Sequence, residues 1–145
     1  MRYTDWLIPR LQNLEQVRYS IPNMETKLQT LKLQYSAIRA ASTDATPVMG
    51  GVSGREDALI ANIAERQELE KNLQFARAEV KELEEALEHL QQDERTVLVG
   101  FYVRRRRSAA DWLAGEMNCD RATVYRIRER GLIAMARMLY GRVEL

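Results

Sequence analysis

Apolar residues in the first 40 positions recur at steps of three or four, which is the spacing of one face of an α-helix. These positions are Leu7, Leu11, Leu14, Val17, Ile21, Met24, Leu28, Leu31, Tyr35 and Ile38. Pro9 lies within the first turns, where proline is tolerated, whereas Pro22 interrupts the middle of the pattern and removes a backbone donor. The pattern predicts helices over about residues 4–19 and 21–40, either as two helices or as one bent rod.

A second helical pattern covers residues 56–92, where apolar positions alternate steps of four and three. Its seam is of the coiled-coil type and runs through Leu69, Leu73, Ala76, Val80, Leu83, Leu87 and Leu90. Residues 41–55 separate the two patterns and are rich in Gly, Ser, Thr and Pro, which predicts a loop. Two arms of equal length on either side of a loop predict a long antiparallel helical hairpin. Because a two-helix hairpin buries little surface, we expect it to associate further, either with a second copy or with the C-terminal domain. Self-pairing would make the protein a homo-oligomer, a dimer held through these helices.

The C-terminal third of the chain fits the requirements of a helix-turn-helix, which are a small residue where the helices cross, a tight turn and apolar inner faces. Ala114 is the small residue, and Asn118, a type that tolerates left-handed backbone, occupies the turn. Asp120 is placed to cap the second helix by accepting a hydrogen bond from the amide of Ala122 or Thr123. The apolar inner positions are Leu113, Met117, Cys119, Val124 and Ile127.

Together these patterns predict an all-α fold with two domains. Residues 1–92 form the coiled-coil-like hairpin with its loop at 41–55, and residues 93–145 form the helix-turn-helix domain. The second helix of the motif starts at Asp120 and continues to about Tyr140, because an apolar stripe extends that far and Gly141 follows as a stop signal.

Residues 90–140 resemble region 4 of the sigma-70 family of transcription factors. In that family an acidic-Arg-x-Val-Leu helix ending in an aromatic residue precedes the helix-turn-helix, and here Asp93–Leu98 and Phe101-Tyr102 fill that part. The stretch Trp112–Val124 is similar to the family's Glu-Ile-Ala-x-x-Leu-Gly-Cys-Ser-x-x-x-Val. No counterpart of the promoter-melting region 2 is present, so a stand-alone sigma factor is not expected. The whole chain looks like the small phage and prophage regulators of the ArpU/RinA type, which implies control of phage late genes.

Candidate DNA contacts follow from helix geometry. If Val124 and Ile127 point inward, the opposite face of the same helix is free to enter the major groove. Arginine can pair bidentately with guanine, and a small side chain can meet a thymine methyl group. The candidates on this helix are Arg121, Ala122, Thr123, Tyr125 and Arg126, with Arg128 and Arg130 further round, toward phosphates or acidic partners.

Four consecutive arginines, Arg104, Arg105, Arg106 and Arg107, precede the motif. Four unpaired guanidinium groups are too costly to bury, so they must face solvent, phosphate or acidic side chains. We expect them to contact DNA phosphates. Pairing with the acidic 56–92 helix and a solvated charge run are the alternatives.

The charge distribution agrees with a nucleic-acid surface at the C-terminal end. The formal net charge is +1, but residues 56–92 hold 4 Lys/Arg against 10 Asp/Glu, whereas residues 93–145 hold 11 against 7. The basic segment would attract phosphate and the acidic segment would repel it. We therefore expect a sequence-specific transcription regulator whose partner is double-stranded DNA.

The remaining composition narrows the function classes. One cysteine, Cys119, and one histidine, His89, do not suffice for a metal cluster or a nucleophile–histidine pair, so neither an enzyme nor a bound cofactor is expected. We expect a cytoplasmic protein, since no apolar run approaches a membrane span and the first residues lack a signal-peptide pattern. Two alternatives stay open: an RNA polymerase-binding module of the sigma region 4 kind, and a phage DNA-packaging subunit like the small terminases.

Overall fold

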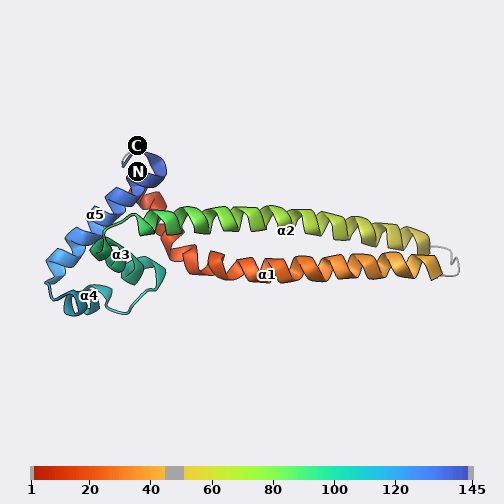
Figure 1. The fold of residues 1–145 in the computed structure, drawn as a ribbon, viewed down its shortest axis with the longest axis horizontal. Helices are drawn as coiled ribbons and strands as arrows, with labels where there is room; N and C mark the ends of the chain where they lie inside the picture. Colours follow the sequence, from red (N-terminus) through yellow and green to blue (C-terminus); the bar gives the residue numbers. More distant parts are fainter. Residues whose placement is uncertain (1, 45–50, 144–145) are drawn as a thin grey trace. The chain divides into compact units, whose positions relative to one another are not determined.

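A computed structural model describes residues 2–44 and 51–143 of the chain, and every element in it is helical. The described residues form five α-helices, labelled in Figure 1, and one π-helical turn, η1, between α3 and α4. Their bounds are α1 Tyr3–Asp44, α2 Gly51–Glu88, α3 Gln92–Leu98, η1 Val99–Val103, α4 Ala109–Met117 and α5 Arg121–Tyr140. The predicted all-helical class is confirmed.

The predicted helix boundaries needed two corrections in the first half of the chain. Of the two alternatives for residues 4–40, the continuous one is right, because α1 passes through Pro22 without ending. Most of the helical stability of a long amphipathic helix comes from packing, and Leu14 and Leu28 are buried on either side of this proline. The loop predicted at 41–55 is wrong at both ends, since 41–44 belong to α1 and 51–55 to α2, while 45–50 lie outside the described residues.

The chain divides into two compact units. One contains both ends of the chain, Met1–Arg18 with Ala78–Leu145, and is called the terminal unit below. The other, Tyr19–Arg77, is called the central unit. The terminal unit thus combines the segment expected to carry the helix-turn-helix, 93–145, with parts of both arms of the expected hairpin.

Within the central unit, α1 and α2 run antiparallel. The Asn62 side chain of α2 donates from Nδ2 to the backbone oxygen of Leu31, 2.9 Å away, and is itself buried. Nearby, Arg66 lies over the ring of Tyr35 at 4.8 Å, and Lys27 pairs with Glu65 at 3.5 Å. A buried amide that bonds the opposite backbone fixes the register of the two helices, because a shift would leave the amide unsatisfied.

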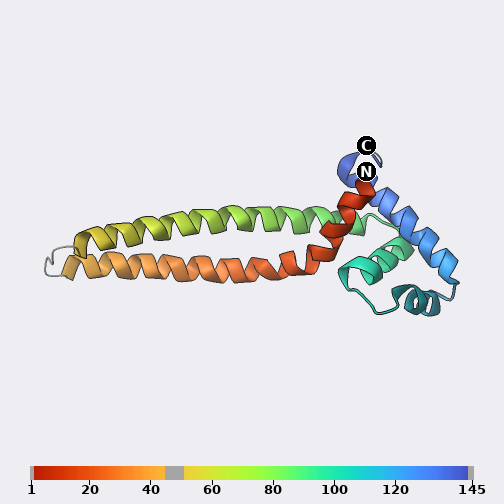
Figure 2. The same ribbon diagram turned by 180° about the vertical axis from the view of Figure 1, so that it is seen from behind.

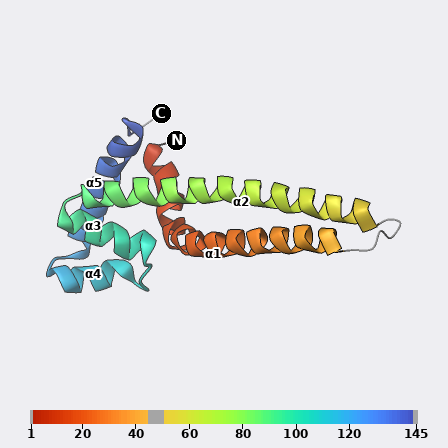
Figure 3. The same cartoon turned by 45° about the vertical axis from the view of Figure 1, so that its right-hand side comes forward.

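The terminal unit has a core built from all parts of its sequence. Leucines from the start of α1, the end of α2, α3 and α4 are inaccessible to solvent, namely Leu7, Leu11, Leu14, Leu83, Leu98 and Leu113. The ends of this unit are joined by a hydrogen bond from the Tyr3 amide to the Val143 oxygen, 2.7 Å, where the red and blue ends of the ribbon meet in Figure 2. Figure 3 shows α3 and α4 lying against α5, so α5 is held from several sides.

In the described part of the chain, none of the helices combines the length and the apolar character that crossing a membrane would require.

Candidate nucleic-acid interface

The connection between α4 and α5 has the geometry that its residue types predict. Asn118 ends α4 with left-handed backbone at a φ of 52°, and the next amide, that of Cys119, donates to the Ala114 oxygen at 3.1 Å. The Thr123 amide donates to Asp120 Oδ1 at 2.8 Å, which confirms the predicted cap. At its far end α5 stops at Gly141, whose φ of 71° disfavours other residues. The turn, the cap and the stop are all local features and were all predicted.

The inner face of α5 is fixed by a small cluster of buried side chains. Leu113 of α4, Val124 of α5 and Val97 of α3 are fully buried, and Ile127 is nearly so. Further apolar side chains lie half-buried against this cluster, and they are Phe101, Ala109, Trp112, Ala114, Met117 and Cys119. All five predicted inner positions therefore belong to this packing. Because Val124 and Ile127 cannot rotate out without opening the cluster, the outer face of α5 is fixed as well.

The predicted outer face of α5 is exposed over its first two turns. Arg121, Ala122, Tyr125 and Arg126 are all exposed, and Thr123 is half-buried between them. Arg126 donates from Nη2 to the Thr123 hydroxyl at 3.1 Å. The structure therefore gathers these five predicted residues on one surface.

Arg121 has an intramolecular partner that the sequence did not indicate. Its Nε lies 3.1 Å from Asp111 Oδ1 on α4. A hydrogen bond with Tyr125 and the charge of Asp111 raise the pKa of the Arg121 guanidinium above its usual value. The ion pair bridges α4 and the start of α5 at the surface, where both side chains are largely exposed.

The side chains of Arg128 and Arg130 contact other parts of the protein, Arg128 two aromatic rings and Arg130 two carboxylates. The Arg128 guanidinium lies 5.0 Å from the ring centre of Phe101 and 4.9 Å from that of Tyr125, and its Nε is buried without a hydrogen-bond partner among the described residues. Arg130 pairs with Asp93 at 2.5 Å and with the buried carboxylate of Glu94 at 3.0 Å. Of the two expectations for Arg130, phosphate or acidic partners, the structure supplies the acidic ones.

The four arginines before α4 fall into two pairs. All four are exposed, but Arg106 stacks on the Trp112 ring at 3.8 Å, and Arg104 Nε lies 3.9 Å from Glu15. For Arg105 and Arg107 no ion pair or ring contact is found within residues 2–44 and 51–143. In the sequence these four residues are a uniform run of charge, whereas in the fold Arg104 and Arg106 contact other side chains and Arg105 and Arg107 face solvent.

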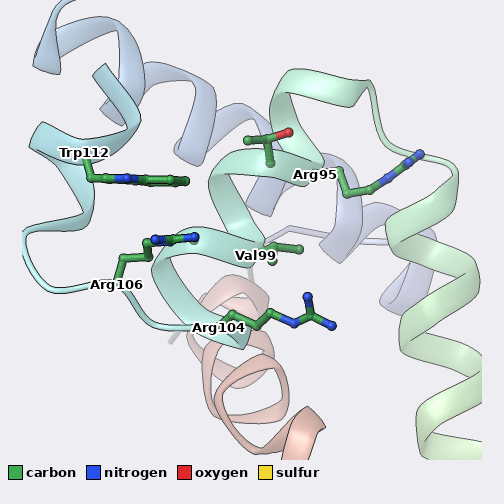
Figure 4. Close-up of a pocket in the computed structure, with 7 residues that line it drawn as sticks. Arg95, Val99, Arg104, Arg106 and Trp112 are labelled. Atoms are coloured by element: carbon green, nitrogen blue, oxygen red, sulfur yellow. The ribbon is translucent and has the colours of Figure 1, made fainter. Parts of the chain in front are cut away.

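A pocket of about 300 Å³ adjoins this loop and was not predicted. Seven residues from α3, η1, the loop and α4 line it: Arg95, Thr96, Val99, Gly100, Arg104, Arg106 and Trp112 (Figure 4). Its residues are drawn from several separate elements, so no spacing in the sequence marks it. The part of the chain that the structure describes contains no group of three or more His, Cys, Asp or Glu arranged to hold a metal ion.

The cap of α5 leads to a pH-dependent prediction. The hydrogen bonds from Thr123 lower the pKa of Asp120, because they favour the ionised carboxylate. Its contribution to stability is therefore fully present above the ordinary carboxyl pKa and is lost as the pH falls through the lowered value. We expect Asp120→Ala to lower the Tm at neutral pH, and we expect the difference from wild type to shrink on acidification below about pH 4.

The matched control is Asp120→Asn, which keeps a capping oxygen without the charge. It should lose less stability than Asp120→Ala at neutral pH. Thermal unfolding of the three proteins across this pH range measures both effects. A constant Tm difference between wild type and Asp120→Ala at every pH would show that the charge of the cap does not matter.

These features define the class of the protein as an all-helical chain with an exposed basic surface on the first turns of α5 and the loop before α4. The family described as a protein of unknown function, DUF1492, matches residues 37–136, which include this whole surface, and the chain belongs to that family. No curated protein matches the chain. No solved structure matches it either.

Proposed function

We propose that this chain is a sequence-specific DNA-binding transcription regulator that reads the major groove with the first turns of α5. The observation that carries the proposal is the division of α5 into two faces. Val124 and Ile127 are packed against α3 and α4, while Arg121, Ala122 and Arg126 are exposed together on the other side. A helix held rigidly by its inner face with a basic, small-residue outer face has the form of a recognition helix.

In this proposal α4 and α5 form a helix-turn-helix of the sigma region 4 kind, and α1 with α2 forms a helical hairpin. The left-handed Asn118, the Asp120 cap and the small residue Ala114 support the first part. The antiparallel contact of Asn62 with Leu31 supports the second. The resemblance to ArpU/RinA-type regulators extends the proposal to control of phage or prophage genes.

The side chains divide into base-reading and phosphate-binding groups. Arg121 and Arg126 would reach base edges, where bidentate pairing with guanine gives specificity, and Ala122 would lie close to the groove floor. Tyr125 would contact a phosphate, with Arg128 held behind it by the two aromatic rings. Arg105 and Arg107, which face solvent, would neutralise backbone phosphates and contribute affinity without specificity.

Two arginine substitutions test this division. Arg126→Ala should cost about 1–3 kcal/mol at a selected site and relax the preference at one base pair. Arg105→Ala should weaken a selected and a scrambled site alike and reduce the salt slope by about one unit. The measurement is equilibrium binding to both duplexes over a range of salt, after selection of a preferred site from random DNA.

Arg137→Ala is the matched control for these variants. Arg137 is an exposed arginine of the same helix in its last turn, outside the proposed groove-facing half, so its removal changes the net charge equally. If Arg126→Ala weakens both duplexes equally and Arg105→Ala alters sequence preference, the two roles are reversed. If neither variant differs from Arg137→Ala, α5 serves a protein partner, and the RNA polymerase-binding alternative takes precedence.

We further propose that the central unit mediates self-association into a dimer. Its two helices leave large apolar side chains exposed, namely Tyr19, Leu33, Ile60, Ile63 and Phe75. Dimers are common among helix-turn-helix regulators, since two copies read two half-sites. A ring of many subunits in sedimentation would favour the DNA-packaging alternative instead.

A further inference from the structure

The pocket beside the loop before α4 has an unusual charge. Three of its seven lining residues are arginines, Arg95, Arg104 and Arg106, and no carboxylate lines it among the described residues. A concave site with one sign of charge and apolar walls concentrates the field and attracts counter-ions. The charge of the pocket therefore favours a negatively charged ligand.

The three guanidinium groups retain unused donors. Arg95 donates from Nε to the Leu87 oxygen at 2.9 Å and from Nη2 to the Glu88 oxygen at 2.8 Å. These bonds satisfy the last carbonyls of α2 and hold the Arg95 side chain in one orientation, with Nη1 left over. The guanidinium of Arg104 lies 3.9 Å from Glu15, which is too long for a hydrogen bond.

Arg106 is held in another way. Its guanidinium is stacked on Trp112 at 3.8 Å, and its backbone amide donates to the Gly100 oxygen at 3.1 Å. Stacking occupies the face of the guanidinium but leaves its edge donors free. Figure 4 shows this stacked pair at one side of the pocket, with Arg95 and Arg104 at the other and Val99 between them.

The chemistry of the pocket favours a phosphoryl group over a carboxylate. A phosphate monoester carries nearly two negative charges at neutral pH and three acceptor oxygens, and planar guanidinium groups bind such oxygens in pairs. The wall of Val99, Gly100 and the Trp112 edge offers an apolar surface for a small organic body.

We propose that this pocket binds the phosphoryl group of a compact organic phosphate of mononucleotide size. A volume of about 300 Å³ is at the lower end of small-molecule sites. The same chemistry has two sources, a free phosphate ester and the DNA backbone, and the test distinguishes them. The proposal does not rest on the proposed function, since a free ligand can occupy the pocket in a protein that binds no DNA.

The test uses the full chain and isothermal titration calorimetry with adenosine monophosphate, inorganic phosphate and adenosine. Adenosine monophosphate and phosphate should bind saturably, and adenosine should not. Arg104→Gln should weaken both by roughly tenfold, because it removes one charge-assisted contact. Arg137→Gln, which removes the same charge outside both the pocket and the proposed DNA surface, should leave both affinities unchanged. Arg104 is 75% exposed on its side chain, so its replacement should not disturb folding.

A second titration with a short random-sequence DNA duplex identifies the source of the phosphate. If Arg104→Gln weakens duplex binding while the free phosphates do not bind wild type, the pocket takes its phosphate from DNA. If Arg104→Gln weakens binding of the free phosphates but leaves the affinity for the duplex unchanged, the ligand is the small molecule. Adenosine binding as tightly as its monophosphate, or equal results for Arg104→Gln and Arg137→Gln with every probe, would overturn the proposal.

Discussion

Ala122→Asp is expected to weaken DNA binding strongly without changing the stability of the fold, whereas Val124→Asp, two residues away, is expected to destabilise the helices around it. Both substitutions add one carboxylate to α5. Ala122 is exposed on the outer face, so an acid there stays hydrated and would lie against DNA phosphates. Val124 is fully buried between Leu113 and Val97, so an acid there has neither water nor a partner.

The two effects should be of different kinds. Val124→Asp should lower the free energy of unfolding by roughly 3–5 kcal/mol, the usual cost of an uncompensated buried charge. Ala122→Asp should reduce affinity for a selected duplex by more than about tenfold, equivalent to roughly 1.4 kcal/mol. Urea unfolding followed by circular dichroism and duplex binding of the folded variant give the two numbers.

Ala122→Ser serves as the neutral control, since it changes the same position without charge. It should fold and bind nearly as wild type does. Wild-type DNA affinity in folded Ala122→Asp would mean that the outer face of α5 does not meet DNA. An unchanged stability of Val124→Asp would mean that α5 is not packed through this face.

Leu14→Ala is expected to destabilise the terminal unit by about 2–5 kcal/mol, the range for truncating a fully buried leucine. Leu14 lies in α1, far in sequence from α5, yet it is inaccessible to solvent within the compact unit that contains α3, α4 and α5. Its loss should therefore lower the stability of the proposed DNA-binding helices. Chemical unfolding monitored by the fluorescence of Trp6 and Trp112, which both belong to the terminal unit, reports on that unit.

Gln16→Ala, an exposed position one half-turn away, is the matched control and should leave stability within about 0.5 kcal/mol. If Leu14→Ala and Gln16→Ala unfold alike, the start of α1 does not contribute to the core of the terminal unit. The structure predicts instead that a fragment beginning near residue 93 is less stable than the full chain, because it lacks the buried Leu7, Leu11 and Leu14.

The sequence predicted those parts of the molecule that depend on near neighbours. The seam from Leu73 to Leu87 is buried at every apolar step, because residues three and four apart share one face of any helix. Leu90 is buried too, but α2 ends at Glu88, short of the predicted end near residue 92. The Asp120 cap and the Asn118 turn were predictable for the same reason, since each depends on contacts within a few residues. The exposed outer face of α5 followed once its inner face was identified.

Other local signals were outweighed by packing. Pro22, Gly51 and Gly54 are poor helix formers, so the sequence alone predicts a kink or break at Pro22 and a loop at the two glycines. All three residues lie in helices. At Pro22 the cost of a missing backbone hydrogen bond is small beside the burial of the apolar stripe that contains Leu14 and Leu28. Helix propensity determines where a helix ends only where tertiary packing does not act on the same residues.

Only the tertiary structure decided which distant groups meet. Arg121 with Asp111, Arg128 with Phe101, and Arg106 with Trp112 are contacts between different elements, and no periodicity specifies them. The same holds for the union of residues 1–18 with the C-terminal helices and for the basic pocket beside Arg104. The sequence by itself determined the helices, their buried faces and the capped turn before α5, because hydrogen bonds and side-chain spacing along one chain segment are local. The tertiary fold decided which arginines are already paired and which remain available to a ligand, because that depends on how separate helices pack.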